Sequence, residues 1–174
     1  MGVEEHRSTA GRPVLGFALL TVSDSRDEKS DKGGPLLASL VTAAGHRVVV
    51  RAIVKDEVAA IRDQVASFFE MEQVEALLVT GGTGLAPRDV TIEAIPPLFE
   101  KEIPGFGELF RMLSFQEIGA AAMLSRATAG LASGRVVFLL PGSPKALDLA
   151  LTRLVLPELP HLLAHARKPG AVRR

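Results

Sequence analysis

Two acidic side chains stand where the sequence predicts the ends of two buried strands. Asp56 follows the valine-rich run 47–54, and Asp89 follows the apolar run 76–79 after a short loop. The carboxyl ends of parallel strands share one edge of a sheet, so we expect both carboxylates to face one metal ion. Magnesium prefers a pair of carboxylates completed by phosphate oxygens and water molecules. The two aspartates therefore predict a catalytic, metal-binding site, although both also precede predicted helices and could serve only as helix caps.

A glycine-rich loop lies between the apolar run 76–79 and Asp89. Its residues are Thr80, Gly81, Gly82, Thr83 and Gly84. Glycine tolerates backbone angles that bring several N–H groups onto one side, where they bind phosphate, and a predicted helix at Val90–Phe99 adds the positive end of its dipole. Because the Asp89 carboxylate would repel a bare phosphate, this arrangement indicates a metal-bound nucleotide. A tight strand-to-helix turn, with Asp89 or Thr91 as a helix cap, is the alternative.

The loop differs from the two common nucleotide-binding motifs. Its spacing does not match the G-x-G-x-x-G dinucleotide fingerprint, and no G-K-[ST] follows it as in a Walker loop. The chain has no G-x-S-x-G motif either, so an acyl-enzyme hydrolase is not expected. Glu158, His161 and His165 share helical spacing, but no further candidate ligand lies near them in the sequence, and we expect a structural role for them.

Two further polar segments follow predicted strands and should reach the same edge of the sheet. The first predicted strand leads into Ser23 and Asp24, and the last one leads into a break that contains proline and glycine. The candidate binding residues in that break are Pro141, Gly142, Ser143 and Lys145. Ser143 before Pro144 is also an ordinary helix start, and Lys145 could either neutralise phosphate charge or be solvated.

Apolar runs alternate with amphipathic helical segments along the chain. The predicted strands span residues 14–22, 47–54, 76–79 and 135–140. This alternation predicts an α/β fold, a three-layer α/β/α sandwich with a mostly parallel sheet. We expect one domain over residues 14–165, flanked by flexible tails at residues 1–13 and 166–174. Residues 120–131 fit either a strand or a helix.

The composition narrows the class of function. Among 174 residues, 20 lysines and arginines balance 20 aspartates and glutamates, so no basic excess favours nucleic-acid binding. The chain contains no cysteine, which excludes disulfides, thiol nucleophiles and thiolate metal sites. No run is long and apolar enough to span a bilayer, and residues 1–12 lack the apolar core of a signal peptide. We therefore expect a cytoplasmic protein with small-molecule substrates and neither nucleic-acid nor membrane partners.

Four motifs, in order along the chain, resemble those of a known family. They read T-G-G-T-G-L-A-P-R-D-V-T-I-E-A, P-G-F-G-E-L-F-R-M-L-S, M-L-S-R-A and L-P-G-S-P-K-A. The family comprises the molybdenum-cofactor biosynthesis proteins of the MoaB and Mog type, which are related to the G domain of gephyrin. The resemblance covers residues 14–163, and the segment A-G-H-R-V-V-V-R-A-I-V-K-D-E is more similar to MoaB than to Mog proteins.

The resemblance implies a reaction, molybdopterin adenylyl transfer. In this family AMP passes from Mg-ATP to the terminal phosphate of molybdopterin, and pyrophosphate is released. By motif position, Asp56 and Asp89 would be the catalytic, magnesium-associated residues, and Gly81–Gly84 would line the nucleotide phosphates. Ser125 would approach the pterin or its phosphate, and the segments after the first and last strands would complete the pocket.

The resemblance also implies a homo-oligomer, either a trimer or a hexamer, and a strand at residues 122–131. One departure is visible, because Ile92 stands where the family's D-V-T-P-E has proline, and this affects the rigidity of the helix start more than the chemistry. Two alternatives stay open: a molybdopterin carrier without catalysis, and a nucleotide pyrophosphatase domain of the CinA type. The P-R-D-V-T and P-G-F-G-E segments argue against the second.

Overall fold

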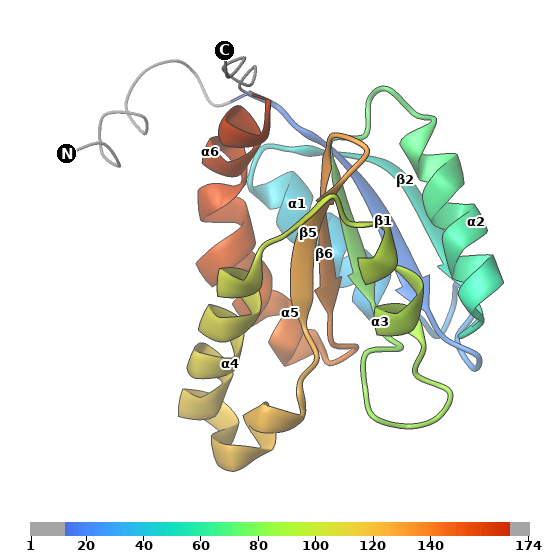
Figure 1. Cartoon of the computed structure of the whole chain (residues 1–174), viewed down its shortest axis with the longest axis vertical. Coiled ribbons are helices and arrows are strands. Elements are labelled where there is room, and N and C mark those ends of the chain that lie inside the picture. Colours follow the sequence, from blue (N-terminus) through green and yellow to red (C-terminus); the bar gives the residue numbers. More distant parts are fainter. Residues whose placement is uncertain (1–12, 168–174) are drawn as a thin grey trace, which may run out of the picture.

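The computed structural model describes residues 13–167 and shows a six-stranded sheet with helices on both faces (Figure 1). Residues 1–12 and 168–174, which make up most of the two predicted tails, lie outside the described residues. At the C-terminal boundary, the last helix continues to Ala166, and Arg167 forms an ion pair with Glu75. Within residues 13–167, no helix combines the length and apolar character needed to cross a membrane.

The sheet is mixed but mostly parallel, as predicted. Its strands are β1 Gly16–Val22, β2 Arg47–Val54, β3 Ala76–Thr80, β4 Lys101–Glu102, β5 Thr128–Ala132 and β6 Arg135–Leu140. They lie in the order β2-β1-β3-β6-β5-β4. The four predicted strands are the parallel ones, so their carboxyl ends share one edge, whereas β5 is antiparallel to β6 and β4 is antiparallel to β5. That shared edge is where the polar segments of the sequence converge.

The helices form two layers, one on each face of the sheet. They span α1 Gly33–Ala43, α2 Val58–Phe69, α3 Thr91–Ala94, α4 Pro104–Ile118, α5 Pro144–Ala150 and α6 Leu156–Ala166. Three shorter segments are the 3-10 turns η1 Pro96–Leu98 and η2 Gly119–Leu124, and the π-helical η3 Leu151–Val155. Buried residues of α1, α4, α5 and α6 pack in one core cluster, and those of α2 and α3 pack in the other. The chain therefore has the predicted three-layer arrangement.

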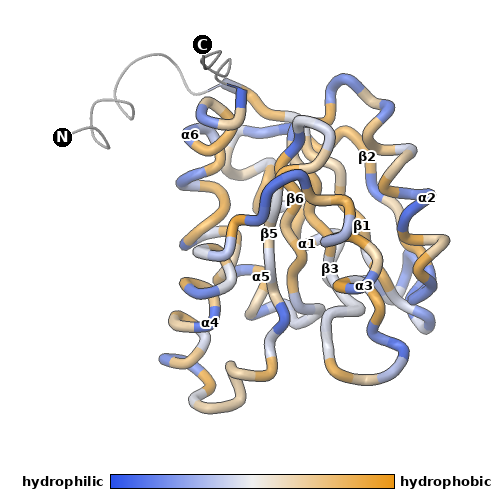
Figure 2. Tube along the Cα trace, viewed as in Figure 1, coloured by the Kyte–Doolittle hydropathy of each residue, from blue (hydrophilic) through white to orange (hydrophobic). Residues whose placement is uncertain are grey.

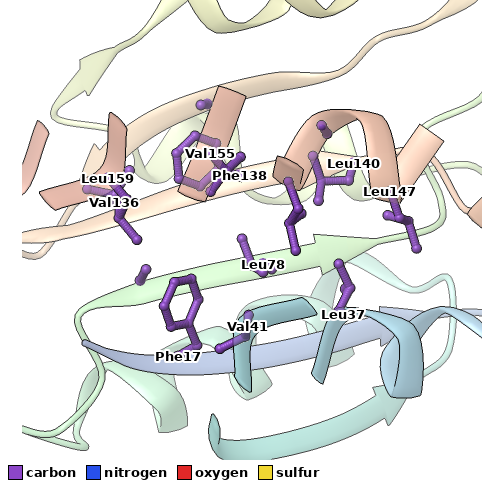
Figure 3. Packing of buried hydrophobic residues seen from close by; sticks show 14 of the residues in the cluster. Phe17, Leu37, Val41, Leu78, Val136, Phe138, Leu140, Leu147, Val155 and Leu159 are labelled. Atoms are coloured by element: carbon purple, nitrogen blue, oxygen red, sulfur yellow. The ribbon is translucent and has the colours of Figure 1, made fainter. Parts of the chain in front are cut away.

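Both faces of the central strand β1 are buried, which explains its nearly continuous apolar sequence. Phe17 packs in the first cluster with Leu78 of β3 and Phe138 of β6 (Figure 3). Leu20, on the opposite face, lies in the second cluster with Phe68 of α2. Figure 2 shows the same pattern as apolar strands at the centre and hydrophilic stretches on the surrounding helices.

The predicted helix at Val90–Phe99 is shorter than expected. α3 ends at Ala94, and the separate turn η1 follows at Pro96–Leu98. Proline lacks the N–H group that an α-helix needs, and its ring clashes with the preceding turn, so Pro96 and Pro97 end the helix. A four-residue helix carries a small dipole, and any phosphate site here depends on loop N–H groups instead.

Residues 120–131 adopt neither of the uniform structures considered. The turn η2 covers Gly119–Leu124, and β5 begins at Thr128. The strand that the resemblance implied at residues 122–131 is therefore confirmed only in its second half. β5 returns to β6 through Ser133 and Gly134, whose φ angles of +49° and +71° match the hairpin turns that suit twisted strands.

Candidate functional site

The first two glycines of the loop stand at positions that strongly favour glycine. Gly81 and Gly82 have φ angles of +97° and +60°, a region that other residues adopt at a cost. A β-carbon at Gly81 would collide with the carbonyl oxygen of Val22 at the end of β1. At Gly82 it would lie 2.5 Å from Oδ1 of Asp56 and closer still to Oγ1 of Thr91. The missing side chains are what let β1, Asp56 and α3 approach the loop.

Hydrogen bonds anchor the start of the loop to the end of β6 and to α3. The N–H group of Gly81 donates to the carbonyl of Leu140, at 3.2 Å, and Oγ1 of Thr80 donates to the carbonyl of Pro141, at 3.0 Å. The buried Thr91 donates from Oγ1 to Gly81 at 2.9 Å and from its N–H to Gly82 at 3.0 Å. These bonds turn the first two carbonyls of the loop toward α3.

These hydrogen bonds change which N–H groups of the loop could bind a phosphate. The N–H group of Gly81 is already committed to a carbonyl, so it is not a donor for a ligand. Those of Gly82, Thr83 and Gly84 make no hydrogen bond to any of the described residues. The donors that remain for an anion therefore come from Gly82–Gly84, one residue later than the motif alone implied.

Asp56, just beyond β2, points one carboxylate oxygen at this loop. Its Oδ1 is buried and has no hydrogen-bond partner among residues 13–167, while its backbone N–H donates to Oδ1 of Asp24 at 3.2 Å. Burial raises the pKa of the Asp56 carboxyl above its usual value, and the negative charges of Asp24 and Asp89 raise it further. An unpaired oxygen in a negative surrounding is an arrangement that a cation would relieve.

Asp89 reaches the same loop from its far end. Its Oδ2 accepts the N–H of Ala86 at 2.9 Å and lies 2.6 Å from where a β-carbon of Gly84 would stand. Asp56 thus lies against Gly82 and Asp89 against Gly84, so the structure brings the predicted pair together at one loop. Neither aspartate caps a helix: the residues before α2 and α3 are Glu57 and Val90, and neither makes a capping bond with its side chain. The helix-cap alternative for this pair is wrong.

The predicted segment after β1 contributes a third carboxylate. Ser23 donates its N–H to the carbonyl of Val54 at 2.8 Å, which holds the segment beside the end of β2. Asp24 then accepts the backbone N–H of Asp56 through Oδ1 and forms an ion pair through Oδ2 with Arg88, which follows the glycine loop. Ser23 and Asp24 therefore lie where the sequence predicts them, at the edge of the sheet formed by the carboxyl ends of the parallel strands.

These residues fit a magnesium ion that also contacts phosphate. No group of three or more metal-ligating side chains able to hold a metal occurs in the described part of the chain. Magnesium does not need one, because it is ordinarily bound by one or two carboxylates with the remaining positions filled by phosphate oxygens and water. Asp56 has a free, buried oxygen for such a role, and Asp89 retains its second carboxylate oxygen. We therefore treat both as the predicted metal ligands.

The segment after β6 also lies at this edge of the sheet, but its side chains mainly start and fix the following helix. Ser143 accepts the N–H of Ala146 at 3.4 Å and caps α5, with Pro144 at the first helical position, so the helix-start interpretation is confirmed. Pro141 is fixed through Thr80, and a β-carbon at Gly142 would lie 3.8 Å from the Cα of Gly81. Lys145 is exposed.

Ser125, the predicted pterin contact, directly follows η2. Its Oγ accepts the N–H of Ala127 at 3.3 Å, and Arg111 of α4 donates to the carbonyls of Ser125 and Ala127 at 3.4 and 3.1 Å. The next residue, Arg126, donates to the carbonyl of Thr83 in the glycine loop and to that of Asp89 beyond it. Sequence reasoning missed Arg126, although it stands beside Ser125 in the M-L-S-R motif.

Comparisons with known proteins identify the family. The family model described as "Probable molybdopterin binding domain" matches residues 18–161. Molybdenum cofactor biosynthesis protein B of Bacillus subtilis (strain 168) is 49% identical over 169 residues, which cover 97% of this chain and 99% of the relative. The chain belongs to the MoaB/Mog family of molybdopterin-binding domains.

Solved structures of MoaB/Mog proteins share this fold. A crystal structure of a molybdenum cofactor biosynthesis protein B has a TM-score of 0.87 and 46% identity, and the match covers 90% of this chain and 98% of that one. The tungsten cofactor synthesizing protein MoaB from Pyrococcus furiosus has a TM-score of 0.77 at 39% identity, over 89% and 98% of the two chains. The protein CinA from Thermoplasma acidophilum, with a TM-score of 0.60 at 15% identity, shares the fold alone.

We expect Asp56→Asn to stabilise the protein at neutral pH. Because the folded-state pKa of Asp56 is raised, the wild type loses stability as pH rises from 3.8, the ordinary value, through that raised pKa. The gain should be below about 1 kcal/mol, since solvent screens a partly exposed group, and it should vanish in acid. Melting curves from acid to neutral pH, with and without Mg²⁺, measure this. A variant that melts below the wild type at pH 7 would contradict the idea that the charged Asp56 destabilises the fold.

We expect Gly82→Ala to harm the site more than Gly45→Ala, its matched control. Both glycines have a positive φ angle, +60° and +82°, so both variants carry backbone strain of about 1 kcal/mol. Only Gly82 has neighbours that a β-carbon would meet, namely Asp56 and Thr91. Thermal unfolding and Mg-ATP affinity report the two effects. Equal affinities for the two variants would show that close approach at Gly82 is unimportant.

Proposed function

We propose that this protein acts in molybdenum cofactor biosynthesis as a molybdopterin adenylyltransferase. The observation that carries the proposal is the buried, unpaired Oδ1 of Asp56 beside the unbonded N–H groups of Gly82–Gly84. The first could hold a magnesium ion and the second a phosphate chain, which together describe Mg-ATP. The names of the relatives support the pathway, and the adenylyl transfer itself rests on the site.

The chemistry needs little from a side chain acting as base. The attacking group would be the terminal phosphate of molybdopterin, whose second pKa, if like that of other phosphate monoesters, is about 6. At neutral pH this oxygen is already largely deprotonated when it attacks the α-phosphorus of ATP, and the α–β bond breaks to release pyrophosphate. The protein has to align two anions that repel each other and stabilise the charge that develops.

The proposed roles combine where the residues lie with what the family resemblance implies. The N–H groups of Gly82–Gly84 would bind the phosphates of the nucleotide and stabilise the transferred group. Asp56 and Asp89 would hold magnesium, which neutralises phosphate charge when bound. Ser125 would contact the pterin substrate or its phosphate, and the exposed Lys145 would add positive charge at the rim.

A carrier that binds molybdopterin without transferring AMP is the second candidate, because the family model names binding alone. Titration calorimetry with Mg-ATP and, separately, with molybdopterin, combined with an assay for AMP transfer, separates the two candidates. Nucleotide binding together with transfer would support the enzyme. Pterin binding without transfer would support the carrier. A CinA-type pyrophosphatase is not favoured, because that likeness extends to the fold alone.

We also propose a cytoplasmic homo-oligomer, a trimer or a hexamer, as the resemblance implied. Six large apolar side chains of α4 and η2 are exposed among the described residues, and an adjoining apolar pocket is lined by three of them. The six are Leu109, Met112, Phe115, Ile118, Met123 and Leu124. Exposed large apolar side chains that gather on neighbouring elements are typical of protein–protein contacts. A second copy of the chain is the occupant that we propose.

We expect Asp89→Asn to lower AMP transfer by at least about 100-fold, comparable to losing one strong electrostatic contributor. The asparagine oxygen can still accept the N–H of Ala86, so the fold should survive with a similar melting temperature. Asp63→Asn, at an exposed site on α2, is the matched control and should retain activity. A small loss at equal melting temperature would count against the metal role of Asp89.

We expect Phe115→Arg to dissociate the oligomer, because it places a charge on a side chain that is 62% exposed in the single chain. Light scattering coupled to size-exclusion chromatography measures the mass of the particle. Glu117→Arg, on the same helix but outside the apolar set, is the control and should keep the wild-type mass. If Phe115→Arg also keeps that mass, the contact lies elsewhere.

A further inference from the structure

Arg126 lies between β5 and the glycine loop and donates hydrogen bonds to three residues. Its Nε donates to the carbonyl of Thr83 at 3.2 Å, and its Nη2 donates to the carbonyl of Asp89 at 3.0 Å. Its Nη1 pairs with the carboxylate of Glu93 in α3, and this pairing lowers the pKa of Glu93. One planar guanidinium group therefore joins the beginning of the turn 83–89, its end, and the helix that follows.

The turn has little else to hold it. Residues 84–88 are exposed. Within the turn, Ala86 and Asp89 bond each other through Asp89 Oδ2 and their backbones. From outside it, among residues 13–167, the hydrogen bonds and ion pairs come from Arg126 and, through the exposed Arg88, from Asp24. Figure 1 shows the loop extending from the body of the protein next to α3.

We propose that Arg126 is a positioning residue for the metal–nucleotide site. By holding the carbonyls of Thr83 and Asp89, it fixes the distance between the two ends of the turn. That distance determines whether the Asp89 carboxylate lies against Gly84 and faces the same space as Asp56. The proposal rests on the proposed function, because it assigns the turn to binding Mg-nucleotide.

The role requires arginine and not just a positive charge. Guanidinium presents several N–H donors in a rigid plane, so it can serve two carbonyls and a carboxylate at once. The ammonium group of lysine is a compact point charge on a flexible stem and lacks the planar fork of donors that reaches all three partners. Arg111 adds to this precision, because it holds the carbonyls of Ser125 and Ala127 on either side of Arg126.

Arg62 provides a matched control. It donates from Nε to the carbonyl of Ala94 at 2.9 Å and from Nη2 to that of Glu93 at 3.3 Å, so it also anchors α3 from a neighbouring element. It makes no hydrogen bond to Thr83 or Asp89. Arg62→Lys should therefore reproduce a general loosening of α3 without releasing the turn 83–89.

The experiment compares the wild type, Arg126→Lys and Arg62→Lys as full-length proteins. The ligand is Mg²⁺ with the α,β-methylene analogue of ATP, whose α–β linkage cannot be cleaved, and affinity is measured by calorimetry at several Mg²⁺ concentrations. Amide hydrogen exchange in peptides covering residues 83–90 reports the turn directly. Thermal melting shows whether each variant is folded.

We expect Arg126→Lys to weaken analogue binding by at least about tenfold, through the loss of hydrogen bonds from a charged donor. The Mg²⁺ concentration for half-maximal binding should rise, and exchange at residues 83–90 should accelerate. Arg62→Lys should change neither property. Unchanged binding and exchange in Arg126→Lys, or an equal loss in Arg62→Lys, would overturn the positioning role.

Failure of the proposed function looks different, because it is visible in the wild type. A wild-type protein that binds no Mg-analogue would refute the nucleotide site itself. The exchange measurement would then still decide whether Arg126 holds the turn.

Discussion

The Asp56 carboxylate keeps one oxygen out of water with no hydrogen bond to any described residue, at the point where three acidic side chains meet. Burying a charged oxygen without a partner costs free energy, and two nearby negative charges add to that cost. Three parts of the fold hold the Asp56 carboxylate in this position. β2 delivers Asp56 to the sheet edge, Asp24 binds its backbone, and Gly82 leaves the space that its Oδ1 enters.

The parallel strands make this concentration of charge possible. Since β1, β2, β3 and β6 run in one direction, the segments that follow them reach one edge although they are far apart in the sequence. Hydrogen bonds between these segments then fix the details: Ser23 binds the end of β2, Thr80 binds Pro141, and Thr91 binds the first loop carbonyls. The site is therefore a property of the sheet edge as a whole rather than of any single motif.

Sequence reasoning recovered the parallel strands because burial on both faces leaves a continuous apolar run, as in Gly16–Val22. It also placed Asp56 and Asp89 together, because strand ends are topologically constrained. It overestimated the helix at Val90–Phe99, where the apolar pattern continues past two prolines that stop the hydrogen bonding. β4, with two residues, is too short to leave a periodic signal.

The finer details of the site depend on contacts that no local pattern encodes. The hydrogen bond from the Gly81 N–H to Leu140 depends on the position of β6, because Leu140 lies 59 residues further along the chain than Gly81. Arg126 belongs to the same M-L-S-R motif as Ser125, but its hydrogen bond to Thr83 depends on the position of β5, which the motif does not encode. By contrast, Ser143 caps α5 through a local bond, and its sequence neighbours were enough to anticipate that role.

The turn η2 runs directly from the exposed side chains of Met123 and Leu124 into Ser125 and Arg126. Contacts that cover Met123 and Leu124 also restrain Ser125 and Arg126, because no flexible spacer separates the two pairs. If neighbouring subunits of the proposed oligomer provide that cover, each chain would depend on them for the order of its candidate site. The proposed activity per chain would then decline on dilution as subunits separate, even though every residue of the site belongs to a single polypeptide.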